Sequence, residues 1–443
     1  MKKKAVIITL GCAKNTCDSE NMAYLLSEAG FEILTEVEGA QIVIINTCGF
    51  IEAAKTESVQ TILEAVSYKE ENPGVKLMIC GCLSQRYARE LSEEIPEADY
   101  ILGVMNMYDI AGILKDEIAP STPPNIYLKD KNSPIRETGR ILSEKAGYAY
   151  VKIAEGCNRN CTYCAIPLIR GRQRSRSMED IFGEVQRLAQ TEGRGEIILV
   201  AQDTGEYGTD NYGRRMISPL IEKIAQIKEV KLIRLLYVYP EAIDDELIQA
   251  YQNCPKLAHY IDIPFQHISD RVLKRMARRT NKAQITEKIA LLRRLVPDMA
   301  IRSTFIAGFP GETIEDLEEL ADFLKSARLT RAGVFAYSEE EGTPAAKMEG
   351  KIEEEEKERR RDYLMEVQQE VSSRVMAEFV GQTLEVMVDE VQEEGFYCAR
   401  SYMDSPDVDG AVYFTSEKVH NIGETVSVYI NDSTEYDLWG TEQ

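Results

Sequence analysis

The chain has 443 residues, of which 44% are apolar and 28% are charged, a composition typical of a globular protein with two or three domains. Its formal net charge of −22 disfavours a nucleic-acid-binding surface and favours basic partners. The sequence has no run of about 18 apolar residues, so it predicts no membrane-spanning helix and no membrane partner. The apolar stretch at residues 5–10 is too short for an export signal, so we expect a reducing cytoplasm, in which the ten cysteines form no disulfides and clustered thiols suggest metal binding or catalysis.

Residues 1–120 alternate strand-like and helix-like patterns. Apolar runs at residues 5–10, 41–46 and 75–80 predict buried strands, and helical patterns lie between them. This alternation predicts an α/β domain built on a parallel sheet. A polar, proline-rich stretch follows, and we interpret residues 121–142 as a linker.

Residues 143–375 repeat the alternation on a larger scale. They predict a partial parallel (βα)6 barrel, a fold that places its chemistry at the carboxyl ends of the strands. The six apolar strand candidates are residues 148–154, 196–201, 231–239, 258–265, 300–308 and 332–337. Residues 378–443 differ, because short β-branched and aromatic runs separated by turn residues predict a small antiparallel β-barrel.

The motif CNRNCTYC follows directly after the first strand of the predicted (βα)6 barrel. Its cysteines, Cys157, Cys161 and Cys164, have the spacing C-x3-C-x2-C. Three thiolates on one tight loop can hold three irons of a [4Fe–4S] cluster, which leaves one iron open for the amino and carboxylate groups of S-adenosylmethionine (SAM). Zinc is the alternative, although zinc usually takes four protein ligands or three and a water.

Four further residues are candidates for contact with SAM. Tyr163 lies inside the cysteine motif and can pack beside the adenine, or it can simply fill space in the loop. Gln202 ends the second strand of the predicted barrel. Gly308 and Pro310 follow the fifth strand and let the backbone approach a ligand, although an ordinary strand-to-helix turn also explains them. No residue is assigned as catalytic, and His267, at the end of the fourth strand, is given no proton-transfer role.

Three cysteines of the N-terminal segment, Cys12, Cys48 and Cys82, each follow a predicted strand by one to three residues. Because the carboxyl ends of parallel strands share one edge of a sheet, we expect these thiols to converge. Three converging thiolates suggest a second [4Fe–4S] cluster with one open iron, and the alternative is a set of unrelated buried cysteines. Cys80 is predicted to pack inside its strand, and Cys17 to face the core from the first helix.

The motifs GCAKNTCDSE, INTCGF, GCLSQRY and CNRNCTYC, together with the terminal β-barrel, resemble the methylthiotransferase family of radical SAM enzymes along nearly the whole chain. The resemblance implies an N-terminal auxiliary cluster domain, a radical SAM core and a C-terminal TRAM domain. It also implies SAM and two [4Fe–4S] clusters as cofactors. By motif, Cys12, Cys48 and Cys82 match the auxiliary ligands, and Cys157, Cys161 and Cys164 match those of the SAM cluster. The chain departs from the family at Cys17 and at Cys80.

Five stretches resemble the family branch that modifies ribosomal protein S twelve: LIRLLYVYP, HYIDIPFQHISDRVLKRM, YSEEEGTPAA, RSYMDSPDVDG and EYDLWG. The implied reaction is methylthiolation of the β-carbon of an aspartate. Residues 381–443 carry 14 Asp plus Glu against 2 Lys plus Arg, a formal charge of −12, which suits a basic protein better than RNA. A solvated acidic surface that touches nothing is the other explanation of this charge. The transfer-RNA branch of the family and a non-catalytic iron–sulfur scaffold are the alternative functions.

The resemblance further implies that SAM is used in two ways. One molecule methylates a sulfur at the auxiliary cluster, and another is cleaved to a deoxyadenosyl radical that removes hydrogen from the substrate carbon. An electron donor such as flavodoxin or ferredoxin is therefore expected as a partner. The substrate protein is expected either free or on the small ribosomal subunit.

Overall fold

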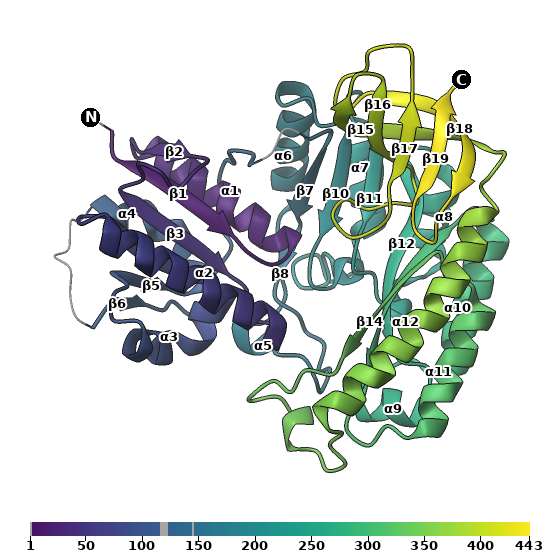
Figure 1. The fold of residues 1–443 in the computed structure, drawn as a ribbon, viewed down its shortest axis with the longest axis horizontal. Helices are drawn as coiled ribbons and strands as arrows, with labels where there is room; N and C mark the ends of the chain where they lie inside the picture. The colour runs from purple at the N-terminus through teal and green to yellow at the C-terminus, as the bar shows by residue number, and fades with distance from the viewer. Residues whose placement is uncertain (1, 116–122, 144–145) are drawn as a thin grey trace. The chain divides into compact units, whose positions relative to one another are not determined.

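The computed structural model describes residues 2–115, 123–143 and 146–443 (Figure 1). Residue 120, where the first predicted domain ends, and residues 121 and 122 of the predicted linker lie outside the described residues. The chain divides into two compact units. The first comprises Met1–Glu144, Ala154–Arg176 and Ser338–Ala346, and the second comprises Lys145–Ile153, Ser177–Tyr337 and Lys347–Gln443.

The first unit contains a parallel sheet with the strand order β2-β1-β3-β4-β5-β6. The three strands predicted from apolar runs are confirmed as β1, β3 and β4, and three short strands extend the sheet. The bounds are β1 (Lys4–Thr9), β2 (Glu32–Leu34), β3 (Ile42–Thr47), β4 (Lys76–Gly81), β5 (Tyr100–Leu102) and β6 (Asn125–Tyr127). Strand β6 comes from the segment that the sequence presents as a linker.

Helices cover both faces of this sheet (Figure 1). Side chains of β3 alternate between two cores: Val43 packs with Ile62 of α2, and Ile44 packs with Met22 of α1. Every residue of β3 is buried, and the strand begins with four consecutive apolar residues, as expected of a central parallel strand. The helices are α1 (Ala13–Glu28), α2 (Glu52–Glu71), α3 (Cys82–Glu94), the 3-10 turn η1 (Val104–Asp109) and α4 (Ile110–Lys115).

Two later segments belong to the same unit. One begins with β8 (Ala154–Glu155), contains the short helix α5 (Ile166–Ile169) and returns through β9 (Arg174–Ser175). Strands β8 and β9 pair antiparallel and close this segment into a loop. The other segment, Ser338–Ala346, contributes Glu340, whose carboxylate pairs with Arg86 and Lys55.

The second unit contains a parallel sheet whose strands are adjacent in chain order, β7-β10-β11-β12-β13-β14. This arrangement confirms the six predicted strands. Their bounds are β7 (Tyr148–Lys152), β10 (Glu196–Val200), β11 (Leu232–Leu235), β12 (Leu257–Gln266), β13 (Ala300–Ala307) and β14 (Arg331–Ala336). The helices between and after them are α6 (Met178–Thr191), α7 (Ile217–Ala225), α8 (Asp245–Asn253), α9 (Asp270–Arg275), α10 (Lys282–Leu295), α11 (Ile314–Ala327) and α12 (Glu354–Ala377). The remaining 3-10 turns are η2 (Thr204–Glu206), η3 (Pro240–Ala242) and η4 (Ala345–Lys347).

Local sequence signals explain where several of these helices begin. Thr313 caps α11 by accepting a hydrogen bond from the Asp316 backbone, and Asp316 bonds back to the Thr313 backbone. Asn281 and Gln284 form the same reciprocal arrangement at the start of α10. These caps fix the start of α11 directly after the turn that follows β13, a turn that carries two of the predicted SAM contacts.

The C-terminal residues form a closed barrel with the order β15-β16-β17-β19-β18, which confirms the predicted small β-barrel. Its strands are β15 (Thr383–Glu393), β16 (Phe396–Arg400), β17 (Val412–Thr415), β18 (Thr425–Ser433) and β19 (Leu438–Glu442). Within the second unit, the loop after β16 meets the amino ends of the parallel strands. There Asp409 accepts hydrogen bonds from Tyr260 and Arg302, and Asp404 pairs with Arg331.

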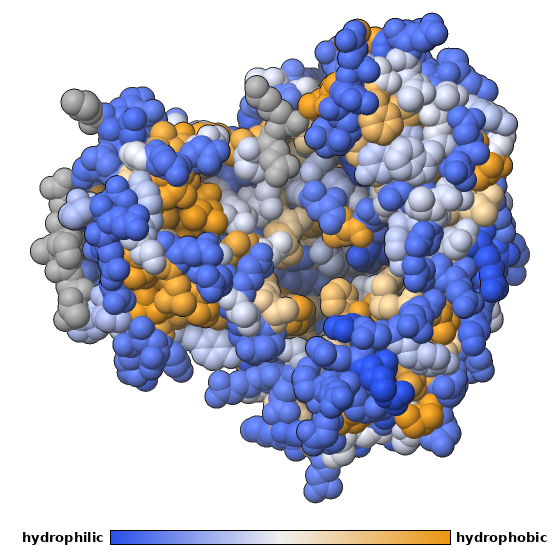
Figure 2. Space-filling model, viewed as in Figure 1, coloured by the Kyte–Doolittle hydropathy of each residue, from blue (hydrophilic) through white to orange (hydrophobic). Residues whose placement is uncertain are grey.

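Polar side chains cover most of the face presented in Figure 2. Apolar patches appear where α2 is drawn in Figure 1, and the exposed apolar side chains of that helix include Val59 and Leu63. In the parts of the chain that the structure describes, no helix combines the length and the apolar character needed to cross a membrane.

Candidate functional site

The first unit places Cys12, Cys48 and Cys82 at one edge of its sheet. Cys12 precedes α1, Cys48 directly follows β3, and Cys82 is the first residue of α3, directly after β4. Because β1, β3 and β4 are neighbours in the sheet, all three cysteines stand at the carboxyl ends of adjacent parallel strands. The residues that the sequence presents as auxiliary ligands therefore come together, although their role as ligands stays a prediction.

Glycines allow the cysteine-bearing turns to approach one another. A Cβ on Gly11 would lie 2.9 Å from Sγ of Cys48, and one on Gly49 would lie 2.7 Å from the Leu83 backbone. Gly81 has a φ of +100°, and a Cβ there would lie 2.5 Å from the carbonyl oxygen of Thr47. A side chain at any of these positions would push the turns apart, so the glycines fix the spacing of the three thiols.

Asn15 joins two of these turns. Its side-chain amide donates to the carbonyl oxygens of Leu10, at 2.7 Å, and Thr47, at 3.2 Å. Asn46 donates in turn to the carbonyl oxygen of Asn15 at 3.0 Å and to Ser19 at 2.9 Å. These side-chain bonds hold the chain before Cys12 against the chain before Cys48.

The three thiols influence each other's ionisation. Burial is the largest cause that raises the pKa of Cys82 to about 12; the thiols of Cys48 and Cys12 act in the same direction, and the charge of Arg170 opposes them. Burial also raises the pKa of Cys48. At Cys12 burial acts in the same direction, but the charges of Lys14 and Arg170 and two backbone hydrogen bonds bring its pKa below the ordinary value. Three thiolates at this edge would repel one another, so the arrangement suits a bound positive core.

The group predicted at Cys12, Cys48 and Cys82 is a [4Fe–4S] cluster and not a single ion. In the described residues, no group of three or more His, Cys, Asp or Glu side chains is arranged around one metal ion. A [4Fe–4S] cluster is larger, and each of its thiolates binds a different iron, so its ligands stand further apart than those of one ion. Cys12, Cys48 and Cys82 offer three sulfur donors from three different turns, which is the donor chemistry that such a cluster takes.

Cys157, Cys161 and Cys164 lie on the loop between β8 and α5, in the same unit. The backbone N–H of Cys157 donates to the carbonyl oxygen of Gly171 at 3.1 Å, and that of Cys164 donates to Cys161 at 3.1 Å. The N–H of Arg159 points at Sγ of Cys157 at 3.3 Å. A backbone donor aimed at a cysteine sulfur is typical of iron–sulfur loops, because it stabilises thiolate charge.

The predicted SAM contacts fall in both units. Tyr163 lies within the cysteine loop of the first unit, whereas Gln202, Gly308 and Pro310 lie in the second unit, at the carboxyl ends of β10 and β13. The N–H of Gly308 donates to both carboxylate oxygens of Glu312 at 3.0 Å. These four assignments stay predictions.

Glu312 and His267 lie at the carboxyl ends of β13 and β12 in the second unit. Arg360 donates to Glu312 at 2.9 Å. Because the same buried carboxylate accepts from the N–H of Gly308, it holds the turn that contains Gly308 in place. Nδ1 of His267 accepts a hydrogen bond from the Ser269 backbone at 3.0 Å, and its Nε2 lies 3.5 Å from Glu312. Both ring nitrogens of His267 therefore face protein groups.

The other cysteines pack elsewhere. Cys80 is buried within β4, with its Sγ 3.9 Å from Sδ of Met22, and burial raises its pKa well above the ordinary value. Cys17 is buried on α1. Cys254 ends α8, and Cys398 lies on β16 in the small barrel.

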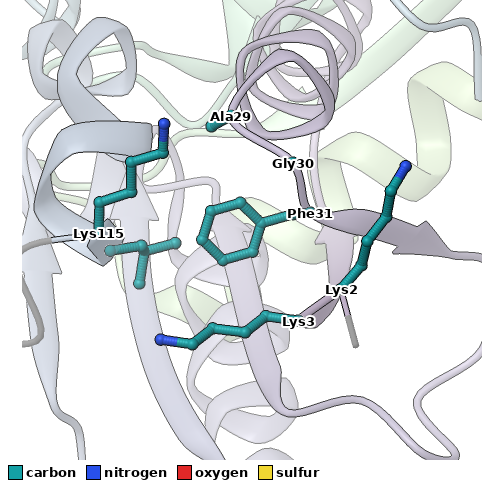
Figure 3. Close-up of a pocket in the computed structure, with 7 residues that line it drawn as sticks. Lys2, Lys3, Ala29, Gly30, Phe31 and Lys115 are labelled. Atoms are coloured by element: carbon teal, nitrogen blue, oxygen red, sulfur yellow. The ribbon is translucent and has the colours of Figure 1, made fainter.

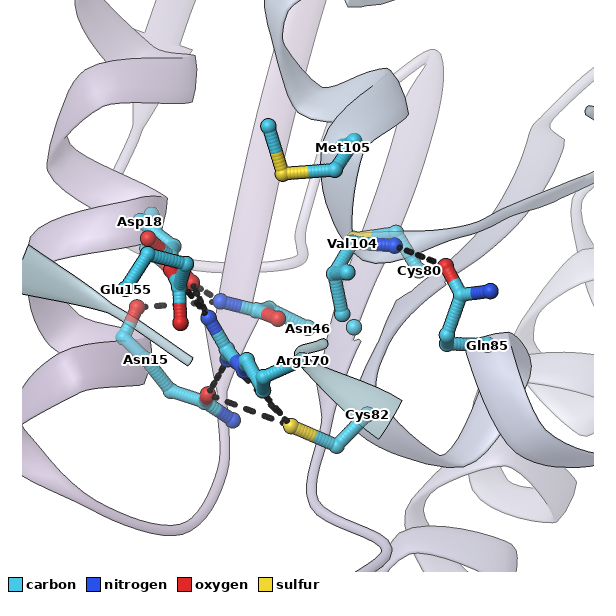
Figure 4. A network of polar contacts seen from close by, with 12 residues as sticks. Asn15, Asp18, Asn46, Cys80, Cys82, Gln85, Val104, Met105, Glu155 and Arg170 are labelled. Carbon is cyan, nitrogen blue, oxygen red and sulfur yellow. Dashed lines mark hydrogen bonds and ion pairs between the residues drawn. The ribbon is translucent and has the colours of Figure 1, made fainter. Parts of the chain in front are cut away.

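Sequence reasoning missed the polar side chains that contact Cys82 directly or through Arg170. The missed residues are Asn15 and Asp18 of α1, Glu155 of β8 and Arg170 directly after α5. The other three side chains accept hydrogen bonds from the guanidinium of Arg170, which also donates to Cys82 (Figure 4). The only available signal was their position, because Glu155 and Arg170 flank the predicted cluster loop and Asn15 and Asp18 follow Cys12. Nothing in a single sequence pairs them with Cys82.

A separate cavity of about 510 Å³ lies at the opposite edge of the first sheet (Figure 3). The side chains of Lys2, Lys3, Phe31 and Lys115 line it, at the amino ends of β1 and β2 and the end of α4. It contains none of the predicted site residues.

Comparisons with known proteins agree with this organisation. Residues 4–103 match the uncharacterized protein family UPF0004, residues 151–324 match the radical SAM superfamily, and residues 380–442 match the TRAM domain. The chain is 45% identical over 439 residues to a protein of Clostridium tetani named ribosomal protein uS12 methylthiotransferase RimO, covering 99% of this chain and 98% of the relative. A relative with the same name in Acetivibrio thermocellus is 44% identical over 449 residues, with the same coverage.

Solved structures show the same fold at low identity. The radical S-adenosylmethionine methyltransferase TsrM of Kitasatospora setae, solved with cobalamin and a [4Fe–4S] cluster, has a TM-score of 0.56 at 13% identity and covers 78% of this chain and 77% of its own. The cobalamin-dependent radical enzyme OxsB has a TM-score of 0.55 at 14% identity, covering 82% of this chain and 56% of its own. At these identities the likeness concerns the fold.

Proposed function

Because the chain belongs to the family of ribosomal protein uS12 methylthiotransferases RimO, we propose that it attaches a methylthio group to the β-carbon of an aspartate in ribosomal protein uS12. It is a radical SAM enzyme that uses SAM and two [4Fe–4S] clusters. The observation that carries the proposal is the presence of two cysteine triads in one compact unit. The relatives do not favour the transfer-RNA alternative, and the enzyme family excludes the non-catalytic scaffold.

Each triad has its own proposed task. Cys157, Cys161 and Cys164 hold the cluster whose open iron takes SAM, and Cys12, Cys48 and Cys82 hold the auxiliary cluster. When bound, these groups supply the radical and sulfur chemistry that an unactivated C–H bond requires, since no ordinary side-chain base removes such a hydrogen. The protein contributes the thiolates, and those of Cys48, Cys82, Cys157 and Cys161 are buried.

The remaining contacts with SAM are proposed from their positions. Tyr163 lies between two of the cysteines and offers a ring to the adenine. Gln202 offers an amide at the end of β10. Gly308 and Pro310 belong to the turn that Glu312 holds in place, at the carboxyl end of β13, where SAM is proposed to bind.

The acidic C-terminal barrel supports a protein substrate. Its charge of −12 over residues 381–443 repels RNA phosphates and attracts a basic protein such as uS12. On its outer surface Trp439 stacks with Tyr413 at 4.8 Å between ring centroids and lies 6.2 Å from Phe396. Stacked rings in an acidic field suit the guanidinium of an arginine on the partner.

Two further partners complete the proposal. Reductive cleavage of SAM needs an electron from outside the protein, and we assign this role to a low-potential carrier such as flavodoxin or ferredoxin. The substrate is met in the cytoplasm, either free or on the small ribosomal subunit, because that is where a ribosomal protein is available.

The proposal is tested with anaerobically reconstituted protein, SAM, a reductant and uS12. We expect mass spectrometry to find a methylthio group on one aspartate of uS12, and comparison of isolated uS12 with small subunits shows which form is the substrate. Transfer RNA serves as the competing substrate. Modification of transfer RNA with unmodified uS12 would overturn the assignment.

A further inference from the structure

The guanidinium of Arg170 has an acceptor for each of its N–H groups (Figure 4). Nε and Nη2 donate to Sγ of Cys82 at 3.3 and 3.2 Å. Nη2 also donates to Asn15 at 2.7 Å, and Nη1 donates to Asp18 at 2.7 Å and to Glu155 at 2.9 Å. These five contacts use the full set of arginine donors, a planar set that the three N–H groups of a lysine cannot reproduce.

The partners of Arg170 come from distant parts of the first unit. Cys82 is 88 residues away in the chain and belongs to the proposed auxiliary site. Glu155 lies two residues before Cys157, and Arg170 itself lies six residues after Cys164, so the pair closes the proposed SAM-cluster loop at both ends. A single buried guanidinium therefore connects the loop of one triad to a sulfur of the other.

The charges around Arg170 favour this arrangement. Its side chain is 3% exposed, and the carboxylates of Asp18 and Glu155 are buried to a similar degree. Two buried carboxylates keep the guanidinium charged and in place, and its remaining donors are left for Cys82 and Asn15. A buried cation with paired N–H···S contacts stabilises negative charge on that sulfur.

We propose that Arg170 is a positioning residue that orients Cys82 as a cluster ligand and raises the reduction potential of the auxiliary cluster. Hydrogen bonds to a ligand sulfur and nearby positive charge favour the reduced form of a cluster, which carries one more negative charge. Since it takes Cys82 to be a ligand, this inference rests on the function proposed above.

The first test compares two buried arginines of the same unit. Arg170→Lys keeps the charge but loses the planar donors, and Arg140→Lys perturbs the buried ion pair of Arg140 with Glu20. Both changes are made in a protein whose SAM-cluster cysteines, Cys157, Cys161 and Cys164, are alanines, so that only the auxiliary cluster can form. We expect Arg170→Lys to shift the midpoint potential, followed by EPR, to a more negative value, while Arg140→Lys leaves it unchanged. Equal potentials for Arg170→Lys and its parent would overturn the inference.

A second measurement leaves Arg170 in place, so it does not depend on whether Arg170→Lys folds. The same three-alanine protein is produced with ¹⁵N-labelled arginine, and the reduced auxiliary cluster is examined by pulsed EPR. We expect a hyperfine coupling to arginine nitrogen that persists in Arg140→Lys. A spectrum without any such coupling would refute the contact between Arg170 and the cluster ligand.

The two tests separate the inference from the function on which it rests. If the three-alanine protein binds no cluster at all, the assignment of Cys12, Cys48 and Cys82 fails, and the role of Arg170 fails with it. If the cluster forms but neither the potential nor the nitrogen coupling depends on Arg170, only the inference about Arg170 fails.

Discussion

Arg234 Nε donates a hydrogen bond of 2.7 Å to Oε1 of Glu196, and neither side chain is accessible to solvent to any useful extent. The second oxygen of Glu196 pairs at 2.9 Å with Arg400, which ends β16 of the small barrel. Glu196 is the first residue of β10, so this carboxylate joins the amino end of the parallel sheet to the C-terminal barrel within the second unit. The carboxyl ends of the same strands are then left for chemistry, as is usual for parallel barrels.

We predict that Glu196→Gln destabilises the protein by about 3–5 kcal/mol, because it leaves the buried guanidinium of Arg234 without its counter-charge and leaves Arg400 with Asp389 alone. The free energy of unfolding is measured in urea by circular dichroism. Glu179→Gln is the matched control, because Glu179 pairs with Lys223 at the surface and a much smaller loss of stability is expected there. Similar losses of stability for both variants would show that the buried ion pairs of Glu196 stabilise the protein no more than a surface pair does.

The same carboxylate makes stability depend on pH. Burial raises the pKa of Glu196, but the charges of Arg400 and Arg234 outweigh it and hold the pKa below the ordinary value. The unfolded state therefore binds the proton more readily, so the contribution of Glu196 is fully present above its unfolded pKa and is lost as the pH falls through its folded pKa. Unfolding curves at neutral and acid pH should show a smaller acid loss for Glu196→Gln than for the parent protein. An unchanged acid loss in the variant would contradict this role.

Alanine substitutions in the two cysteine triads are predicted to abolish different steps of the reaction. Cys161→Ala should abolish the cleavage of SAM to deoxyadenosine, because it removes a proposed ligand of the SAM cluster. Cys48→Ala should keep that cleavage but stop methylthiolation and lower the iron content by about four per chain. Cys17→Ala, another buried cysteine of the first unit, should change neither. Methylthiolation by Cys48→Ala at the parent rate would disprove the auxiliary role.

Position 308, in the turn after β13, is predicted to tolerate no side chain. Gly308 has a φ of +76°, and a Cβ there would lie 2.5 Å from Cγ of Lys357. Gly308→Ala should weaken SAM binding by about tenfold, since strain of about 1–2 kcal/mol must be relieved by moving the turn. Gly213→Ala is a matched control with a φ of +71° and no neighbour within 4 Å. Equilibrium dialysis with SAM checks both, and equal affinities for the two variants would remove Gly308 from the site.

The aromatic group of the small barrel is predicted to contribute to substrate binding. Trp439→Ala should weaken binding of uS12 about fivefold to tenfold, the loss of one stacked cation contact, while cleavage of SAM without substrate stays unchanged. Val419→Ala removes another exposed apolar side chain of the same C-terminal region and should have no effect. Fluorescence anisotropy with labelled uS12 measures the affinity. An unchanged affinity in Trp439→Ala would place the substrate elsewhere.

Much of the fold follows from local patterns. The uninterrupted apolar runs of β3 and β4 and the regular alternation from β7 to β14 identify parallel strands, because both faces of such strands are buried. Short strands are harder to predict from the sequence. For example, β6 has three residues and lies in a polar, proline-rich stretch. Its pairing with β5 depends on a partner distant in the chain, and no local propensity encodes that pairing.

The sequence by itself determined which thiols stand after which strands, and hence the two candidate triads, because parallel strands bring their carboxyl ends to one edge. Only the tertiary structure decided that the loop of residues 154–176 belongs with the first unit and that Arg170 reaches Cys82. The physical reason is the range of the interactions. Strand periodicity is a local property of the chain, whereas a buried guanidinium is satisfied by acceptors from three separate segments that meet only when the protein has folded.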